Sequence, residues 1–189
     1  LPKSIEGYTQ ETGRAGRDGE AADAWMTYGL GDVVQLRQMI AQGDSDDDRK
    51  RVEQRKLDAL VGYCESMACR RQVLLGNFGE TYPQSCGNCD NCLAPPESWD
   101  ASLAAQKALS CVYRSGQRFG AGQLIDILRG AETDRIRQFG HDTLSTYGIG
   151  TELDARAWRG VFRQLVAGGW LAVDVDGHGS LRLTPKSAE

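Results

Sequence analysis

The sequence predicts a mainly helical α+β fold in three segments. Apolar residues recur at helical spacing through much of the chain, strand-like alternation occurs near its C-terminal end, and two breaks in composition separate the segments. The breaks are an acidic run at 44–48 and a proline-containing stretch at 93–98. We therefore expect domains at residues 1–43, 44–100 and 101–189.

Composition places the chain among folded proteins. Of its 189 residues, 40% are hydrophobic and 25% are charged, and no stretch is apolar enough to suggest a membrane span or a signal peptide. We expect a cytoplasmic protein. The net charge is −4, and residues 101–189 carry 11 basic and 9 acidic side chains. Any nucleic-acid surface must therefore come from local clusters of arginine.

The first segment is glycine-rich up to Gly31 and looks like the end of an α/β domain. Asp32 is expected to cap a short helix, whose apolar side chains recur at three-to-four spacing: Val33, Leu36, Met39 and Ile40. The acidic run then suits the start of a longer helix, because carboxylates stabilise the positive end of the helix dipole.

The second segment predicts a helical hairpin. Its first helix has an apolar stripe at positions i, i+3, i+4 and i+7, formed by Leu57, Leu60, Val61 and Cys64. A second helix is expected from about residue 67 to residue 75.

The third segment predicts a winged helix. Its pattern is helix, helix, irregular connection, helix and then two short strands. Leu171, Val173 and Val175 alternate with polar or small residues before the turn at 176–179, and Leu181 and Leu183 alternate after it.

Three cysteines, Cys86, Cys89 and Cys92, are spaced two residues apart in a loop containing glycine and asparagine, which is a strong metal signal. A closed structural zinc site needs a fourth ligand, either Cys64 or Cys69. Cys69 is favoured because Cys64 is explained more simply as part of the apolar stripe.

The sequence disfavours two other chemistries for these cysteines. The spacing also opens a bacterial ferredoxin iron–sulfur motif, but no fourth cysteine follows before Pro96. Disulfides are disfavoured by the expected cytoplasmic context. Cys111, on a predicted helix, is expected to be a core residue.

Two arginines, Arg14 and Arg17, lie between glycines in residues 10–19. Glycine permits a tight loop, and two permanently charged guanidinium groups can meet a phosphate. From these residues alone, a solvated turn remains the alternative.

A row of arginines is expected on the third helix of the last segment. If Asp154 caps this helix, Arg156, Arg159 and Arg163 lie on a different face from its apolar residues, Trp158, Val161, Phe162 and Leu165. The arginines could contact DNA phosphates, with His178 and Arg182 of the wing adding contacts. A solvated face or a protein-binding face is the alternative.

Several strings in this order closely resemble the RecQ family of DNA helicases: Ile5 to Gly19, Cys69-Arg70-Arg71, Asn77 to Glu80, and Cys86 to Cys92. The resemblance implies the end of a second RecA-like lobe, a zinc module and a winged-helix RQC domain. It also implies that Cys69 is the fourth zinc ligand, and that Arg14 and Arg17 act on the ATP γ-phosphate with support from Gln10.

For the complete parent, the resemblance implies ATP, magnesium and 3′ to 5′ unwinding of DNA with a single-stranded tail or fork. It further implies roles in DNA repair, recombination, replication and the SOS response. The chain itself contains no GxxxxGK[ST] phosphate loop. We therefore expect a piece of a longer helicase, inactive alone. The alternatives are a stand-alone zinc and winged-helix DNA-binding protein and an iron–sulfur redox protein.

Overall fold

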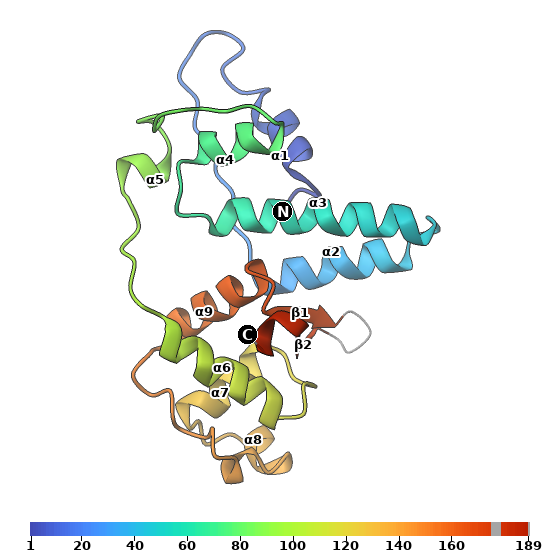
Figure 1. Ribbon diagram of the computed structural model, residues 1–189, viewed down its shortest axis with the longest axis vertical. Helices are drawn as coiled ribbons and strands as arrows, with labels where there is room; N and C mark the ends of the chain where they lie inside the picture. Colours follow the sequence, from blue (N-terminus) through green and yellow to red (C-terminus); the bar gives the residue numbers. More distant parts are fainter. Residues whose placement is uncertain (175–178, 189) are drawn as a thin grey trace. The chain divides into compact units, whose positions relative to one another are not determined.

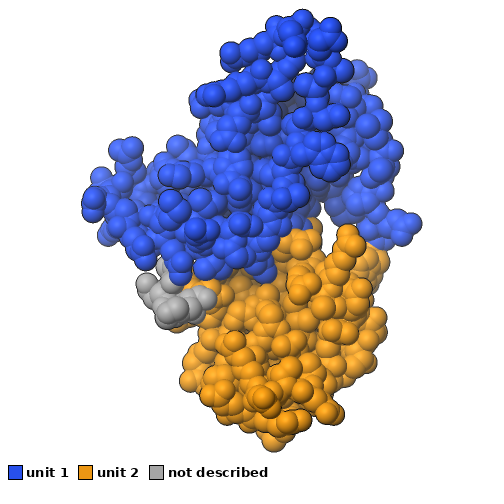
Figure 2. Space-filling model, turned by 180° about the vertical axis from the view of Figure 1, so that it is seen from behind, with its two compact units in different colours: residues 1–98 blue, residues 99–189 orange. Residues whose placement is uncertain are grey.

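The computed structural model describes residues 1–174 and 179–188 (Figure 1). The chain divides into two compact units, residues 1–98 and residues 99–189, which are coloured separately in Figure 2. None of the helices in the described part of the chain combines the length and the hydropathy needed to cross a membrane. A mainly helical α+β fold is confirmed.

The first unit is entirely helical in its described regular structure. Its helices are α1 (Ile5–Thr12), α2 (Leu30–Gln42), α3 (Asp47–Glu65), α4 (Arg70–Asn77) and α5 (Asp90–Leu93). Helix α3 packs against α1, α2 and α4, and the ribbon of Figure 1 shows α2 alongside it. Arg37 of α2 forms a 2.6 Å ion pair with Asp58 of α3. The hairpin expected in this region consists of α3 and α4, with α4 beginning at Arg70.

Polar caps set where two of these helices begin. Asp46 caps α3, with its Oδ1 accepting a 2.8 Å hydrogen bond from the Arg49 N–H, as expected for the acidic run. The prediction that Asp32 caps α2 is wrong. Gly29 is the N-cap, and Asp32 lies inside the first turn, where its Oδ2 accepts a 2.7 Å hydrogen bond from the Gly29 N–H.

The core of the first unit is small. Ile5 of α1 packs with Leu60 and Tyr63 of α3, and partly buried neighbours surround them: Leu1, Tyr8, Met26, Cys64, Val73 and Leu74. The predicted stripe on α3 is confirmed for its first three members, which are almost fully buried, whereas Cys64 is half-buried.

The second unit has the predicted winged-helix order. Its elements are α6 (Ser102–Arg114), α7 (Ala121–Arg129), α8 (Asp134–Gln138), the 3-10 turn η1 (His141–Thr143), α9 (Ala155–Ala167), β1 (Leu171–Asp174), β2 (Ser180–Leu183) and the 3-10 turn η2 (Pro185–Ala188). The connection expected to be irregular therefore contains a short helix, α8, whose first turn is capped by Thr133.

The two strands pair antiparallel, with Leu171 opposite Leu183 and Val173 opposite Leu181. The inward alternation expected from the sequence is confirmed for Leu171, Val173 and Leu181, which are buried. Val175 and the turn residues up to 178 lie outside the described residues.

Helix α9 carries the largest side chains of the second core. Asp154 caps it, with Oδ1 accepting a 2.7 Å hydrogen bond from the Ala157 N–H, and Trp158 and Phe162 are fully buried. Trp158 Nε1 donates to the carbonyl oxygen of Gly150 at 2.8 Å. A Cβ atom on Gly150 would lie 2.5 Å from Trp158 Cζ2, so only glycine fits beside this indole.

Candidate metal centre and nucleic-acid surface

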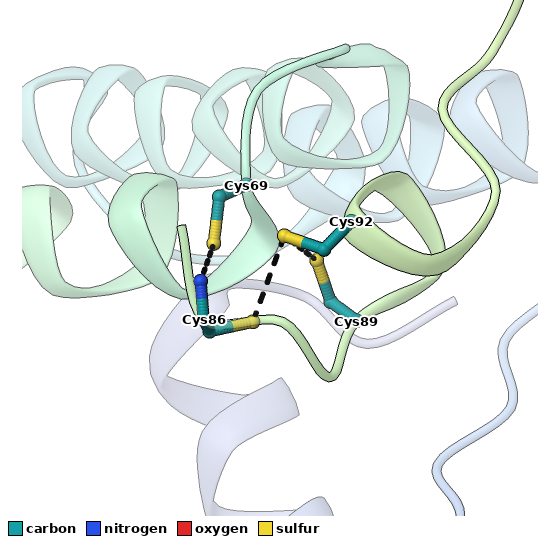
Figure 3. Close-up of side chains that lie close together, drawn as sticks. All are labelled: Cys69, Cys86, Cys89 and Cys92. Atoms are coloured by element: carbon teal, nitrogen blue, oxygen red, sulfur yellow. Dashed lines mark hydrogen bonds between the residues drawn. The ribbon is translucent and has the colours of Figure 1, made fainter. Parts of the chain in front are cut away.

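Four thiols gather at one end of the first unit. Cys69 precedes α4, Cys86 and Cys89 lie in the loop before α5, and Cys92 lies within α5. Their four Sγ atoms all lie within 4.8 Å of one another, and Figure 3 shows the side chains pointing toward a common point. Cys69 is buried and the other three are half-buried.

The spacing of the sulfurs fits a tetrahedral zinc ion. Zn–S bonds of about 2.3 Å place tetrahedral ligands about 3.8 Å apart. The Sγ of Cys92 lies 3.9 Å from that of Cys86 and 3.4 Å from that of Cys89. A set of four thiolates also matches the ligands that zinc uses in closed structural sites, where no position is left for water.

Backbone N–H groups favour thiolate at Cys69 and Cys89. At Cys92 the Gly87 backbone acts in the same direction, but hydrogen bonds with the neighbouring cysteines and burial raise the pKa to about 11. The N–H of Cys86 donates to Cys69 Sγ at 3.4 Å, and the N–H of Arg70 donates to Cys89 Sγ at 3.4 Å. Burial opposes ionisation of Cys69, but hydrogen bonds from the Gln72 and Cys86 backbones outweigh it and lower the pKa of Cys69 to about 6. Thiolate is the form that binds metal.

Arg70 joins the cysteine loop to the end of α3. Its Nε and Nη2 each lie 3.0 Å from a different carboxylate oxygen of Asp90, and Nη1 donates to carbonyl oxygens at the end of α3, those of Tyr63, Cys64 and Ser66. Asn91 adds 2.8 Å hydrogen bonds from Nδ2 to the carbonyl oxygens of Ser66 and Ala68. Orphan carbonyls at a helix end are thereby satisfied.

Sequence reasoning did not identify this role of Arg70. A cation in the first turn of a helix interacts unfavourably with the helix dipole. The position of Arg70 directly after Cys69 therefore indicated that another interaction compensates for this cost.

The two remaining cysteines, Cys64 and Cys111, lie outside the cluster of four thiols. Cys64 is half-buried on α3, and burial raises its pKa to about 11. Cys111 is fully buried in α6, where burial raises its pKa to about 12, and its Sγ lies 3.8 Å from the Leu124 carbonyl oxygen. Both therefore stay protonated near neutral pH.

The arginine motif forms an exposed loop after α1. Gln10 lies near the end of that helix, and Gln10, Arg14 and Arg17 are all exposed. Gly16 has a φ of 68°, and its carbonyl oxygen accepts a 3.1 Å hydrogen bond from the Gly19 N–H. The loop is thus a real tight turn of the kind glycine permits, and it presents two guanidinium groups from one segment.

The arginines of α9 lie off its buried face. Arg156 and Arg159 are exposed, Arg163 is half-buried, and the four apolar residues assigned to the other face are buried. The separation of the two faces predicted from the sequence is confirmed.

The described part of the wing holds one of the two arginine or histidine side chains expected to contact phosphate. Arg182 is exposed, but its Nη2 lies 2.5 Å from Asp174 Oδ2 in an ion pair. His178 lies outside the described residues.

Comparison with known proteins covers both units. A family model for RecQ zinc-binding matches residues 30–93, and a model for the RQC domain matches residues 95–189. The chain is 43% identical over 171 residues to the ATP-dependent DNA helicase RecQ of Pasteurella multocida, covering 90% of this chain and 27% of that protein. It is 45% identical over 166 residues to the protein of the same name from Haemophilus influenzae, covering 88% and 27%.

The fold and the cluster of four thiols define the class of this chain, which is a metal-binding helical module followed by a winged helix. The chain belongs to the RecQ family, whose zinc-binding and RQC domains it contains. It spans about a quarter of the length of the curated relatives it matches, as 27% of each of the two proteins above is covered.

Proposed function

We propose that the chain works as part of a RecQ-like ATP-dependent DNA helicase that unwinds DNA in the 3′ to 5′ direction. The observation that carries this proposal is the presence, in one chain, of a four-thiol centre inside a RecQ zinc-binding match and a winged helix inside an RQC match. The relatives' printed names, which specify ATP and DNA, support the reaction class.

The metal centre has a structural role in this proposal. Cys69, Cys86, Cys89 and Cys92 are the proposed ligands, and a bound zinc ion would supply four strong bonds between the segments around α4 and α5, two helices with no buried residues. The ligands connect the start of α4 to the loop before α5.

The exposed arginine loop has a nucleotide role. Arg14 and Arg17 are proposed to meet the γ-phosphate of ATP held by another lobe of the parent, with magnesium, and Gln10 to support them. Two guanidinium groups on a tight loop can stabilise charge that develops in phosphoryl transfer. Because both side chains are exposed, an approaching phosphate need not displace a packed core.

The winged helix supplies DNA binding. Arg156, Arg159 and Arg163 are the proposed phosphate contacts on α9, with His178 and Arg182 as wing contacts. Contacts to phosphates give affinity with little sequence preference, as suits duplex DNA with a single-stranded tail or fork. We propose that the parent acts in DNA repair, recombination and replication, including the SOS response, in the cytoplasm.

The first test is metal analysis of the purified chain combined with affinity for a forked duplex at two salt concentrations. One zinc per chain and binding that weakens steeply with salt are expected. Bound iron with brown colour would contradict the zinc assignment. Zinc without DNA binding would contradict the DNA role of the winged helix.

A matched pair of charge variants locates the DNA surface. Arg156→Gln should lower the salt slope by about 1, because one phosphate contact is lost. Arg114→Gln removes an equal charge from an exposed position at the end of α6 and should leave the slope unchanged. Equal losses in both variants would mean that α9 makes no particular contribution.

The nucleotide role is tested in a longer protein that contains this chain together with a phosphate-loop lobe. Arg14→Ala or Arg17→Ala should slow ATP turnover by about 10³-fold or more while DNA affinity is kept. Lys3→Ala, which removes another exposed charge near α1, is the control. Turnover within a few fold of the natural protein in both arginine variants would exclude this role.

A further inference from the structure

Arg70 lies between the metal centre and the core of the first unit. Its backbone N–H donates to Cys89 Sγ, and its guanidinium group binds Asp90, the residue that follows this cysteine. The side chain is only 20% exposed, and Cζ lies 5.6 Å from the centre of the Tyr63 ring. One residue therefore contacts the cysteine loop, the end of α3 and a core aromatic ring.

Tyr63 extends this set of contacts to α1. Its ring centre lies 5.3 Å from that of Tyr8, and the two residues belong to the same apolar cluster. Burial raises the pKa of the Tyr63 hydroxyl, and a hydrogen bond with Tyr8 raises it further. Helix α1 ends at Thr12, two residues before Arg14, so the arginine loop starts directly where this packed helix stops.

Helix α1 depends on that packing. It has 8 residues, fewer than the roughly 12–15 that an isolated helix needs to be even marginally stable in water. Ile5 is its only buried residue and Tyr8 is partly buried against the cluster. The helix therefore relies on its contacts with Leu60 and Tyr63 of α3.

The cysteine loop, in turn, depends on the metal. Apart from Cys69, none of the four ligands is fully buried, and α5 has no buried residue, so without metal little apolar packing holds Asp90 against Arg70. Loss of Asp90 would leave the guanidinium group of Arg70 with only neutral acceptors at its half-buried position.

We infer that Arg70 is a positioning residue through which the filled metal site holds α1, and with it the loop carrying Arg14 and Arg17, in place. The sequence of contacts is Cys89 and Asp90, Arg70, Tyr63, Tyr8 and α1. The benefit for nucleotide contact rests on the proposed function, whereas the dependence of α1 on the metal does not.

Amide hydrogen exchange of residues 5–12 measures this dependence without ATP or DNA. In the natural chain, exchange in α1 should quicken at least about tenfold when zinc is removed by a chelator, because the helix opens more often. Arg70→Gln keeps all four thiols and should still bind one zinc at saturating concentration. Its α1 should exchange at the fast rate even with zinc bound, and its zinc affinity should fall roughly 10- to 100-fold.

Two further variants separate this role from general destabilisation. Arg71→Gln changes the adjacent, exposed arginine, which lies over Tyr82 and interacts with the charges of Cys69 and Cys86 but is not part of the Arg70 contact chain. This variant should keep the zinc-dependent protection of α1. Tyr8→Leu removes the aromatic contact between α1 and Tyr63 but keeps an apolar side chain at position 8. It should leave zinc affinity unchanged but give fast exchange in α1 with and without zinc.

Equal exchange of α1 in the zinc-loaded and zinc-free natural chain would overturn the inference. So would full zinc-dependent protection in Arg70→Gln, or in Tyr8→Leu if Arg70→Gln fails to fold. Because exchange is read in α1 alone, loss of the proposed ATP role would leave these outcomes unaltered.

Discussion

The two units are stabilised by different means. Among the described residues, eighteen apolar side chains are buried in the second unit and seven in the first. The first unit instead gathers four thiols and a hydrogen-bond network around the half-buried Arg70, while the second surrounds Trp158 and Phe162 with apolar neighbours. A region with a small core can thus be held by ligand bonds and charge-assisted hydrogen bonds, provided that the metal is present.

The largest expected difference between the units is their response to zinc removal. Structural zinc contributes about 10–16 kcal/mol in zinc-finger peptides, more than the whole stability of many domains. Chelation, or Cys89→Ser, should therefore release the metal and unfold the region from α4 to α5 while the second unit keeps its protection from amide exchange. Full zinc content and an unchanged melting temperature in Cys89→Ser would contradict this.

The reverse perturbation removes a core side chain from the second unit. Phe162→Ala should lower the free energy of unfolding of residues 99–189 by about 3–5 kcal/mol, because a fully buried ring leaves a cavity. Zinc content should stay at one per chain. Denaturant unfolding followed by amide exchange gives the free energy of unfolding of each unit separately. Loss of zinc in this variant would show that the units do not respond independently.

A smaller effect is expected from the cap of α9. Asp154→Ala removes the acceptor for the Ala157 N–H and should cost about 1 kcal/mol in the second unit only. Asp154→Asn keeps an acceptor oxygen and is the control. A loss of several kcal/mol would mean that Asp154 does more than cap the helix.

The smallest effect concerns the pH dependence of the second unit. Burial, aided by the charges of Arg118 and Arg135, lowers the pKa of His141 below its ordinary value of 6.5, despite the opposing charge of Asp142. The unfolded chain then binds a proton that the folded unit resists, so stability should fall as pH drops below 6.5 and level off below the folded-state pKa. Exchange in α7 between pH 7.5 and 5.5, compared with His141→Asn, measures this. An equally steep dependence in the variant would assign the effect elsewhere.

Periodic patterns in the sequence predicted the parts of the fold that depend on neighbouring residues. The stripe beginning at Leu57, the two faces of α9 and the strands at Leu171 and Leu181 were all identified from spacing, because burial follows the period of a helix or a strand. The short helix α8 was missed, since five residues offer too little periodicity.

The site was predictable where its signal is local. The regular spacing of Cys86, Cys89 and Cys92 predicts a metal site directly. The position of Cys69 beside them depends instead on how the chain at the start of α4 packs against the loop. The partners of Arg70 were beyond sequence reasoning, because three are backbone carbonyls and Asp90 lies twenty residues away. Every residue has a backbone carbonyl, so the residue type does not show which carbonyl will accept a hydrogen bond.

The contact between Gly150 and Trp158 has an evolutionary consequence. Because a Cβ atom at position 150 would overlap the indole ring, and the Gly150 carbonyl oxygen accepts the indole hydrogen bond, neither position can change freely while the other stays as it is. Relatives that carry a larger residue at 150 should carry a smaller one at 158. Such paired changes would appear in an alignment as co-variation between two buried positions.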